Sequence, residues 1–191
     1  LKNYFNKLMV IDDLADRKHQ CDILLDQTYG RQEQEYRSIV PKSCVLLLGS
    51  HYALLRPEFA KWRQFSLERR KQPEFKHLLI NMGGIDPDNF TLQILNEITS
   101  CNLPSDINIT VVMGRNSPHQ NSIKAKVATM SFKIEFKSEV DNMAEIMANS
   151  DLAIGAGGAT SWERCCLGLA TIQIIVAPNQ NIITKLLAKK N

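Results

Sequence analysis

The sequence predicts an α/β protein built on a doubly wound parallel sheet. From residue 76 onward, short apolar runs alternate with helical stretches, and several of these runs end in glycine. Alternation at this spacing favours parallel strands joined by right-handed crossovers. In such a sheet, ligands bind at the carboxyl ends of the strands. The loops that follow the strands are therefore the first places to look for a functional site.

The composition indicates a folded protein without a nucleic-acid partner. The 191 residues are 44% hydrophobic, and the net charge of +3 arises from intermingled acidic and basic residues. Five cysteines without a CxxC spacing favour a reduced, cytoplasmic protein. No apolar run approaches the about 18 residues of a membrane-spanning helix. We therefore expect a cytoplasmic location and no membrane partner.

Residues 1–72 are expected to be the C-terminal part of an N-terminal domain, with a linker. The expected strands are residues 7–11, 23–25 and 45–49, and the expected helices are residues 33–39 and 61–71. Gln72 and Pro73 suit a linker, so the predicted boundary lies between them. The chain starts with Leu1 in place of methionine and ends in an uncapped helical pattern. Both ends suggest a fragment of a longer protein.

Residues 73–191 are expected to form a second, nearly complete domain. The expected strands are residues 78–82, 107–113, 132–136, 151–154 and 171–176; helices are expected at residues 86–98, 118–129 and 140–148 and after residue 180. Glycine-containing loops follow three of these strands, beginning at Gly83, Gly114 and Gly155. We expect the three loops to meet at the carboxyl edge of the sheet.

The stretch from residue 151 to residue 163 has the pattern of a strand, a glycine turn and a helix. Small residues before a helix let a ligand approach the backbone, and the first helical amides carry the positive end of the helix dipole. A phosphate fits this arrangement. The residues assigned to phosphate binding are Gly155, Gly157, Gly158, Ala159 and Thr160. Glu163, placed in the opening turn of the helix, could accept hydrogen bonds from ribose hydroxyls.

A second interpretation of this stretch stays open. The glycines could form only a tight turn, and Glu163 could simply complement the helix N-terminus. A dinucleotide fingerprint is disfavoured because its third glycine would fall at Thr160. A Walker loop is absent because the Gly-Lys-Ser/Thr sequence is missing. Elsewhere, His19, Cys21 and Asp22 lie close together, but no second cluster has ligand spacing, so neither a metal nor a cofactor is expected.

Motifs along nearly the whole chain resemble a known enzyme family. They comprise residues 10–17, His19, residues 21–25, 48–49 and 52–59, and then residues 81–87, 155–164 and 179–180. This set is similar to the UDP-2,4-diacetamido-2,4,6-trideoxy-β-L-altropyranose hydrolase family of pseudaminic acid biosynthesis. The glycine loop with Glu163 is shared with the wider glycosyltransferase-B class. The resemblance implies two Rossmann-like domains, the second of which holds UDP.

The resemblance also implies roles for individual residues. The diphosphate loop of the family falls on residues 155–160, its ribose-binding acid on Glu163 and its sugar-side pair on Asn179 and Gln180, while Gly83 and Gly84 flank the cleft. Asn179 is the catalytic candidate; its alternative role is to cap the following helix. The histidine expected to activate water falls before Leu1. Of the histidines present, only His51 is considered as a substitute base.

The reaction implied is hydrolysis of a UDP-sugar at the anomeric carbon. The products would be UDP and a free 2,4-diacetamido-2,4,6-trideoxyhexose, used in nonulosonic acid or surface polysaccharide biosynthesis. Two alternatives remain: a glycosyltransferase of the same fold with a UDP-sugar donor, and a nucleotide-sugar binding module without catalysis. Because the base is missing, the fragment is expected to bind UDP without turnover.

Overall fold

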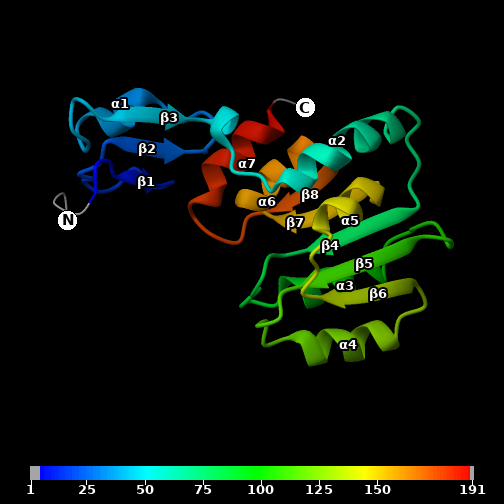
Figure 1. The fold of residues 1–191 in the computed structure, drawn as a ribbon. Coiled ribbons are helices and arrows are strands. Elements are labelled where there is room, and N and C mark those ends of the chain that lie inside the picture. Colours follow the sequence, from blue (N-terminus) through cyan, green and yellow to red (C-terminus); the bar gives the residue numbers. More distant parts are fainter. Residues whose placement is uncertain (1–4, 190–191) are drawn as a thin grey trace. The chain divides into compact units, whose positions relative to one another are not determined.

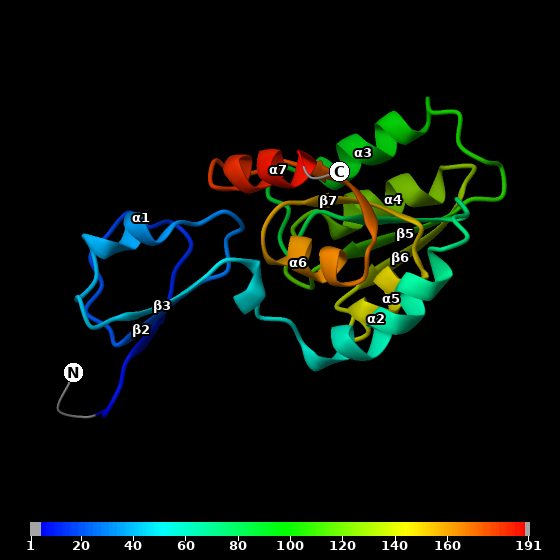
Figure 2. The ribbon, with the colours of Figure 1, turned by 90° about the horizontal axis from the view of Figure 1, so that it is seen from above.

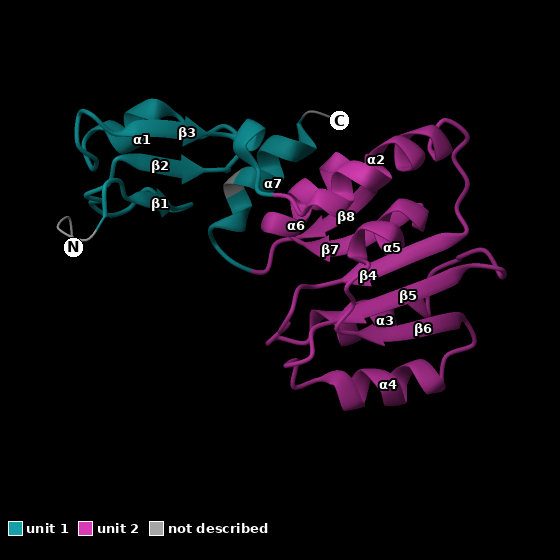
Figure 3. Ribbon diagram, in the orientation of Figure 1, with its two compact units in different colours: residues 1–54, 177–191 teal, residues 55–176 magenta. Residues whose placement is uncertain are grey.

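The computed structural model describes residues 5–189, which divide into two compact units (Figures 1 and 3). Unit 1 contains the described residues up to Leu54 and the segment that begins at Ala177, and unit 2 runs from Leu55 to Val176. Each unit contains a parallel sheet with helices packed against it. The predicted α/β class with parallel strands is therefore confirmed.

Unit 1 is built on a sheet with the strand order β1-β2-β3. Its elements are β1 (Met9–Ile11), β2 (Ile23–Asp26), α1 (Glu33–Arg37), β3 (Val45–Leu48), the 3-10 helix η1 (Ser50–Tyr52) and α7 (Gln180–Ala188). Leu24 of β2 and Tyr36 of α1 are fully buried in its core. The Tyr36 hydroxyl lies 2.8 Å from one carboxylate oxygen each of Asp12 and Asp26. Tyr36 therefore joins the carboxyl ends of β1 and β2.

Unit 2 is built on a sheet with the strand order β6-β5-β4-β7-β8, in which all neighbours are parallel. Its strands are β4 (His77–Asn81), β5 (Asn108–Met113), β6 (Lys133–Ser138), β7 (Leu152–Ala156) and β8 (Ala170–Ile174). Its helices are α2 (Pro57–Arg69), α3 (Phe90–Ile98), α4 (Gln120–Ala128), α5 (Met143–Asn149) and α6 (Ala159–Cys166). These positions confirm the predicted alternation of five strands with helices.

Helices cover both faces of the unit 2 sheet (Figure 2). Side chains of a strand alternate between the two faces, so Leu78 and Ile80 of β4 pack with α3 and α4. Leu79 points to the opposite face, where it packs in the core that contains Phe59 of α2 and Met147 of α5. Because it is buried on both faces, β4 is a nearly continuous apolar run, as is typical of a central parallel strand.

Helix α2 belongs to unit 2, which differs from the predicted division between residues 72 and 73. Its Phe59 is fully buried against the second sheet. The Ser66 hydroxyl donates to the carbonyl oxygen of Leu167 at 2.7 Å, and Arg70 donates to that of Ser150 at 2.9 Å. The segment from Ala177 onward, predicted to lie in the second domain, instead belongs to unit 1. Only packing across distant parts of the sequence reveals these assignments.

Candidate functional site

The strand order of unit 2 reverses between β4 and β7. From β4 the chain continues through β5 to β6 on one side, and it then returns to form β7 and β8 on the other. A doubly wound sheet opens a crevice at this position, outside the carboxyl ends of the two strands. Asn81 pairs with Gly155 in the register of β4 and β7. The turns that contain Gly83 and Gly158 therefore leave the sheet next to each other.

The glycine turn after β7 is shorter than predicted. Gly155 and Ala156 lie within β7, where they pair with Gln173 and Ile174 of β8. A Cβ atom on Gly155 would lie 2.6 Å from Nη1 of Arg164, so glycine leaves room for this guanidinium. The structure thus explains Gly155 by packing, and its predicted role in phosphate binding stays a prediction.

The N-terminus of α6 is open. Gly158 stands at the N-cap position with a φ of 108°, a conformation that favours glycine, and it offers no side chain to cap the helix. Within residues 5–189, the backbone amides of Ala159 and Thr160 have no hydrogen-bond acceptor. The first turn contains no acidic residue. The positive end of the helix dipole is therefore available to an anion.

The helix that follows β4 differs in this respect. Oδ1 of Asp86 accepts a hydrogen bond from the Phe90 amide at 2.9 Å, and Oδ2 accepts one from the Thr91 amide at 2.9 Å. The carboxylate of Asp86 thus satisfies the N-terminus of α3 from within the chain. Of the two helices that follow β4 and β7, α6 is the one left to bind an external anion.

The turn after β4 packs directly on the end of β5. A Cβ atom on Gly114 would lie 2.2 Å from the carbonyl oxygen of Gly84, so no larger residue fits at Gly114. Gly84 itself is exposed, and a Cβ atom on it would meet nothing within 4 Å. Gly83 has a φ of 94° and completes the turn. The turn that contains Gly83 and Gly84 therefore leaves the sheet next to the turn that leads into α6, and it packs on Gly114.

Glu163 lies in the second turn of α6, one turn later than predicted, because the helix begins at Ala159. Its side chain is 18% exposed, and its carboxylate lies 3.9 Å from Nη2 of Arg56. Burial raises the pKa of this carboxyl, against the opposing effect of the Arg56 and Arg164 charges. The helix dipole acts mainly within the first turn. Complementing the helix N-terminus is therefore a poor explanation for Glu163.

Asn179 and Gln180 belong to unit 1, whereas the other predicted site residues belong to unit 2. Asn179 occupies the N-cap position of α7, but its side chain makes no capping hydrogen bond. It is exposed and lines a cavity of about 190 Å³ together with Asp13, Tyr29 and Arg31. The alternative capping role is therefore not fulfilled. The predicted roles of Asn179 and Gln180 toward a sugar stay predictions.

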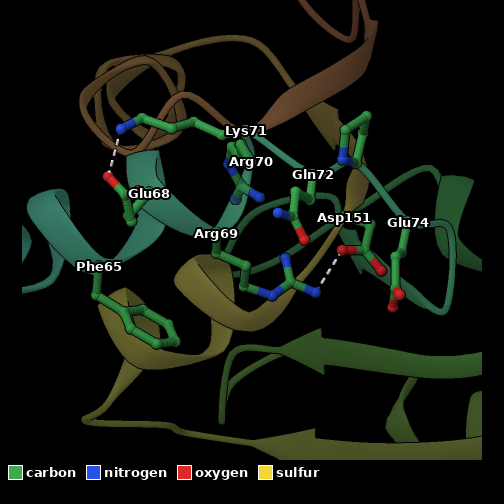
Figure 4. A pocket seen from close by; sticks show the side chains of 9 residues that line it. Phe65, Glu68, Arg69, Arg70, Lys71, Gln72, Glu74 and Asp151 are labelled. Carbon is green, nitrogen blue, oxygen red and sulfur yellow. Dashed lines mark hydrogen bonds and ion pairs between the residues drawn. The ribbon is translucent and has the colours of Figure 1, made fainter.

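A larger cavity of about 590 Å³ lies at the amino edge of the unit 2 sheet, and Figure 4 shows the side chains that line it. It is lined by the end of α2, the following linker and Asp151, which precedes β7 at the amino edge of the sheet. Arg69 pairs with Asp151, and Lys71 pairs with Glu68 at 2.6 Å. Burial opposes ionisation of Asp151, but the amides of residues 76 and 77 and the charge of Arg69 outweigh it and lower its pKa. The Arg69–Asp151 pair in the lining of this cavity therefore connects α2 to the sheet.

Two arginines near the α6 turn were not predicted. Both were part of motifs without an assigned role, Arg56 in residues 52–59 and Arg164 in residues 155–164. The proximity of Arg56 to Glu163 depends on the packing of α2. Arg164 is 2% exposed, and it lies three positions after Ser161, on the same face of α6. The three-residue spacing of Ser161 and Arg164 was the sequence pattern that could have placed Arg164 near the turn. Among residues 5–189, no group of three His, Cys, Asp or Glu side chains is placed to hold a metal, and no helix is long and apolar enough to cross a membrane.

Comparisons with known proteins agree with this architecture. Residues 77–184 match the family described as the glycosyltransferase family 28 C-terminal domain. An uncharacterised protein of Methanocaldococcus jannaschii is 37% identical over 176 residues, which cover 90% of this chain and 36% of that protein. The UDP-2,4-diacetamido-2,4,6-trideoxy-β-L-altropyranose hydrolase of Campylobacter jejuni is 29% identical over 184 residues, which cover 96% of this chain and 63% of the hydrolase. The chain therefore spans only part of each relative.

The fold also occurs in a solved structure. The crystal structure of Acinetobacter baumannii MurG superposes with a TM-score of 0.61 at 20% identity, covering 87% of this chain and 50% of that one. At this identity the likeness concerns the fold alone. Together with the family match and the parallel sheets, it confirms the predicted Rossmann-like, glycosyltransferase-B-like fold.

Proposed function

Because the chain belongs to the family of the glycosyltransferase family 28 C-terminal domain, we propose that it binds a UDP-sugar and serves to cleave it at the anomeric carbon. The observation that carries the proposal is the open N-terminus of α6 at the point where the strand order of unit 2 reverses. Free backbone amides at such a position form an anion site. The diphosphate is the part of a UDP-sugar that suits it.

In this proposal the diphosphate lies on the turn between β7 and α6. The amides of Ala159 and Thr160 donate to it, and the absence of side chains at Gly157 and Gly158 lets it approach the backbone. Glu163 accepts hydrogen bonds from the ribose hydroxyls. Its largely buried carboxylate favours this role, because a ribose diol would satisfy oxygens that are poorly solvated in the free protein.

The same amides would stabilise the leaving group. When the bond between the anomeric carbon and the diphosphate breaks, negative charge accumulates on UDP, and donors fixed beforehand lower the energy of this charge. A single donor of this kind contributes about 3 kcal/mol in enzymes where one has been removed. Asn179 and Gln180 are proposed to contact the sugar. Water would be activated by a base that lies outside this sequence, as expected from the family resemblance.

Hydrolysis is the reaction we favour, because similarity to the Campylobacter jejuni hydrolase extends over 96% of the chain. It therefore includes residues 52–59, the segment of the family resemblance that is specific to the hydrolase and is not shared with the wider glycosyltransferase-B class. The products would be UDP and a free 2,4-diacetamido-2,4,6-trideoxyhexose, consistent with a role in nonulosonic acid or surface polysaccharide biosynthesis. The alternative is a glycosyltransferase, in which an acceptor hydroxyl replaces water. The family match supports this alternative, because the family is named for glycosyltransferases.

Binding of UDP is the first test of this proposal. Titration calorimetry should show that UDP binds the chain more tightly than ADP. Glu163→Ala should weaken UDP binding much more than pyrophosphate binding, because only UDP carries the ribose. Equal affinities for UDP and ADP would argue against a uridine nucleotide site.

Turnover is the second test. The chain should release no UDP from the diacetamido sugar nucleotide, whereas a longer form that includes the preceding domain residues should release it without any acceptor. Release only in the presence of an acceptor alcohol would identify a transferase instead.

A further inference from the structure

The guanidinium of Arg164 lies directly beneath the turn between β7 and α6. Its Nη2 donates to the carbonyl oxygen of Ala156, the last residue of β7, at 2.7 Å. Its Nη1 lies 3.4 Å from Oγ1 of Thr160, whose backbone amide is one of the two open donors. The absence of a side chain at Gly155 provides the space for this guanidinium. Arg164 thus contacts both sides of the turn.

This buried cation has no anionic partner at ion-pairing distance in the described part of the chain. Arg164 is 2% exposed, and its remaining hydrogen bonds go to neutral oxygens: Oγ of Ser161 at 3.3 Å and Oε1 of Gln173 at 3.2 Å. The adjacent Glu163 carboxylate favours the charge of Arg164 only from beyond ion-pairing distance. Its Nε is buried and has no hydrogen-bond partner among residues 5–189. Burial lowers the pKa of Arg164 to about 10, so the side chain is still protonated near neutral pH.

An unpaired buried charge is unfavourable for folding. Removing a charge from water has a large desolvation penalty unless an opposite charge compensates for it. Neutral donors could hold the Ala156 carbonyl and the Thr160 hydroxyl equally well, so packing alone does not explain why a cation stands here. An anion bound at the turn would compensate for the charge, since electrostatic interactions are strong in a weakly solvated environment.

We propose that Arg164 is a specificity-determining residue whose buried positive charge selects a diphosphate at the α6 turn over ligands of lower charge. This inference rests on the proposed function, because it assumes that the turn binds the phosphates of a nucleotide sugar. Arg164 acts through space from beneath the backbone, while the amides of Ala159 and Thr160 make the direct contacts. Affinity should therefore increase with ligand charge in the order uridine, UMP, UDP.

The main experiment compares the buried Arg164 with the partly buried Arg70. Arg164→Met removes the charge and keeps the aliphatic stem, and calorimetry should show UDP binding weakened at least tenfold with uridine binding unchanged. Arg70→Met is the matched control, because Arg70 is partly buried, has a pKa lowered by burial and donates to carbonyl oxygens, but at the amino edge of the sheet. This control should lower thermal stability and leave the ratio of UDP to uridine affinity unchanged.

A second variant keeps the Arg164 guanidinium and balances its charge with a new carboxylate. Gln173→Glu places a carboxylate where Oε1 of Gln173 now lies, 3.2 Å from Nη2 of Arg164. The new carboxylate pairs with the buried guanidinium, and thermal unfolding establishes that the variant is folded before binding is measured. It should nevertheless lose affinity for UDP relative to uridine. Loss of binding in a stable protein excludes misfolding as the cause, so the test holds even if Arg164→Met does not fold.

The outcomes separate the two proposals. If the wild-type chain does not bind UDP, the proposed function fails. If the wild type binds UDP and both Arg164→Met and Gln173→Glu bind it equally well, the proposed function stands and the role of Arg164 is refuted. Equal losses of UDP and uridine affinity in Gln173→Glu would also refute it, because a charge effect must depend on the phosphates.

Discussion

Gly84 and Gly114 are in contact, yet alanine should have opposite effects on stability at the two positions. In Gly114→Ala the new Cβ atom would lie 2.2 Å from the carbonyl oxygen of Gly84 and 2.8 Å from its Cα atom. Favourable contacts need about 3.5–4.0 Å. The neighbour is backbone, so no side-chain rotation relieves the clash, and the turn after β4 has to move. Overpacking of this kind costs about 1–3 kcal/mol.

Gly84→Ala is the matched control on the other side of the same contact. Its Cβ atom would meet nothing within 4 Å, and Gly84 does not have a positive φ. Alanine restricts the unfolded chain more than glycine does, so the variant should be about 0.4–1 kcal/mol more stable than the wild type. If a ligand closely approaches the backbone at Gly84, however, the methyl group should hinder it. UDP affinity should then fall roughly tenfold, by the same overpacking argument.

Urea unfolding without ligand measures the stability effects, and calorimetry with UDP measures the binding effects. We expect Gly114→Ala to be less stable than the wild type, and Gly84→Ala to be more stable but impaired in UDP binding. Equal destabilisation by the two substitutions would refute the packing argument. Unchanged UDP affinity in Gly84→Ala would show that the ligand does not approach this turn.

Three further predictions concern single side chains. Glu163→Gln should raise the free energy of unfolding at neutral pH, because burial raises the pKa of this carboxyl. The stabilising contribution of the carboxyl is complete below 4.5, its pKa in the unfolded chain, and is lost as the pH rises through its folded pKa. Urea titrations should therefore show the difference from the wild type shrinking as the pH falls toward 4.5, and a pH-independent difference would contradict this. Asp151→Asn should destabilise the chain by about 1–3 kcal/mol, because Arg69 loses its partner. The pKa of Asp151 is lowered in the folded chain, so the stability that Asp151 contributes is present above 3.8, its pKa in the unfolded chain, and is lost as the pH falls through the folded pKa. An unchanged midpoint of acid unfolding in Asp151→Asn would count against this role of Asp151. Asn179→Ser should change stability by less than about 0.5 kcal/mol, since Asn179 makes no capping bond, and thermal unfolding tests this directly.

Local patterns were sufficient to predict most elements of the fold. Alternating apolar runs and helical stretches predicted the five strands of unit 2, and the predicted strand at residues 78–82 differs from β4 by one position. Glycines marked the ends of β4 and β7 because chain reversal at those points needs residues without side chains. Such signals depend on neighbours in the sequence, so periodicity and turn composition are enough to detect them.

Within the site, local patterns were less informative. The glycine run after residue 154 was interpreted as one loop, whereas pairing with β8 keeps Gly155 in the strand. Glu163 was placed in the opening turn, but it lies in the second turn because α6 already begins at Ala159, four residues before it. The first difference arises because strand pairing decides where β7 ends, and the second because the exact first residue of α6 decides the turn in which Glu163 falls.

The amino-acid pattern alone was enough to establish a parallel α/β protein with a glycine turn suited to an anion, since both features follow from short-range periodicity and backbone sterics. The tertiary structure was needed to show that α2 packs on the second sheet, that Asp86 satisfies α3 while α6 stays open, and that the guanidinium of Arg164 lies beneath the turn. These features depend on contacts between residues that are distant in the sequence or on the exact start of a helix. Burial and charge pairing exist only once such contacts have formed, so they are properties of the folded chain.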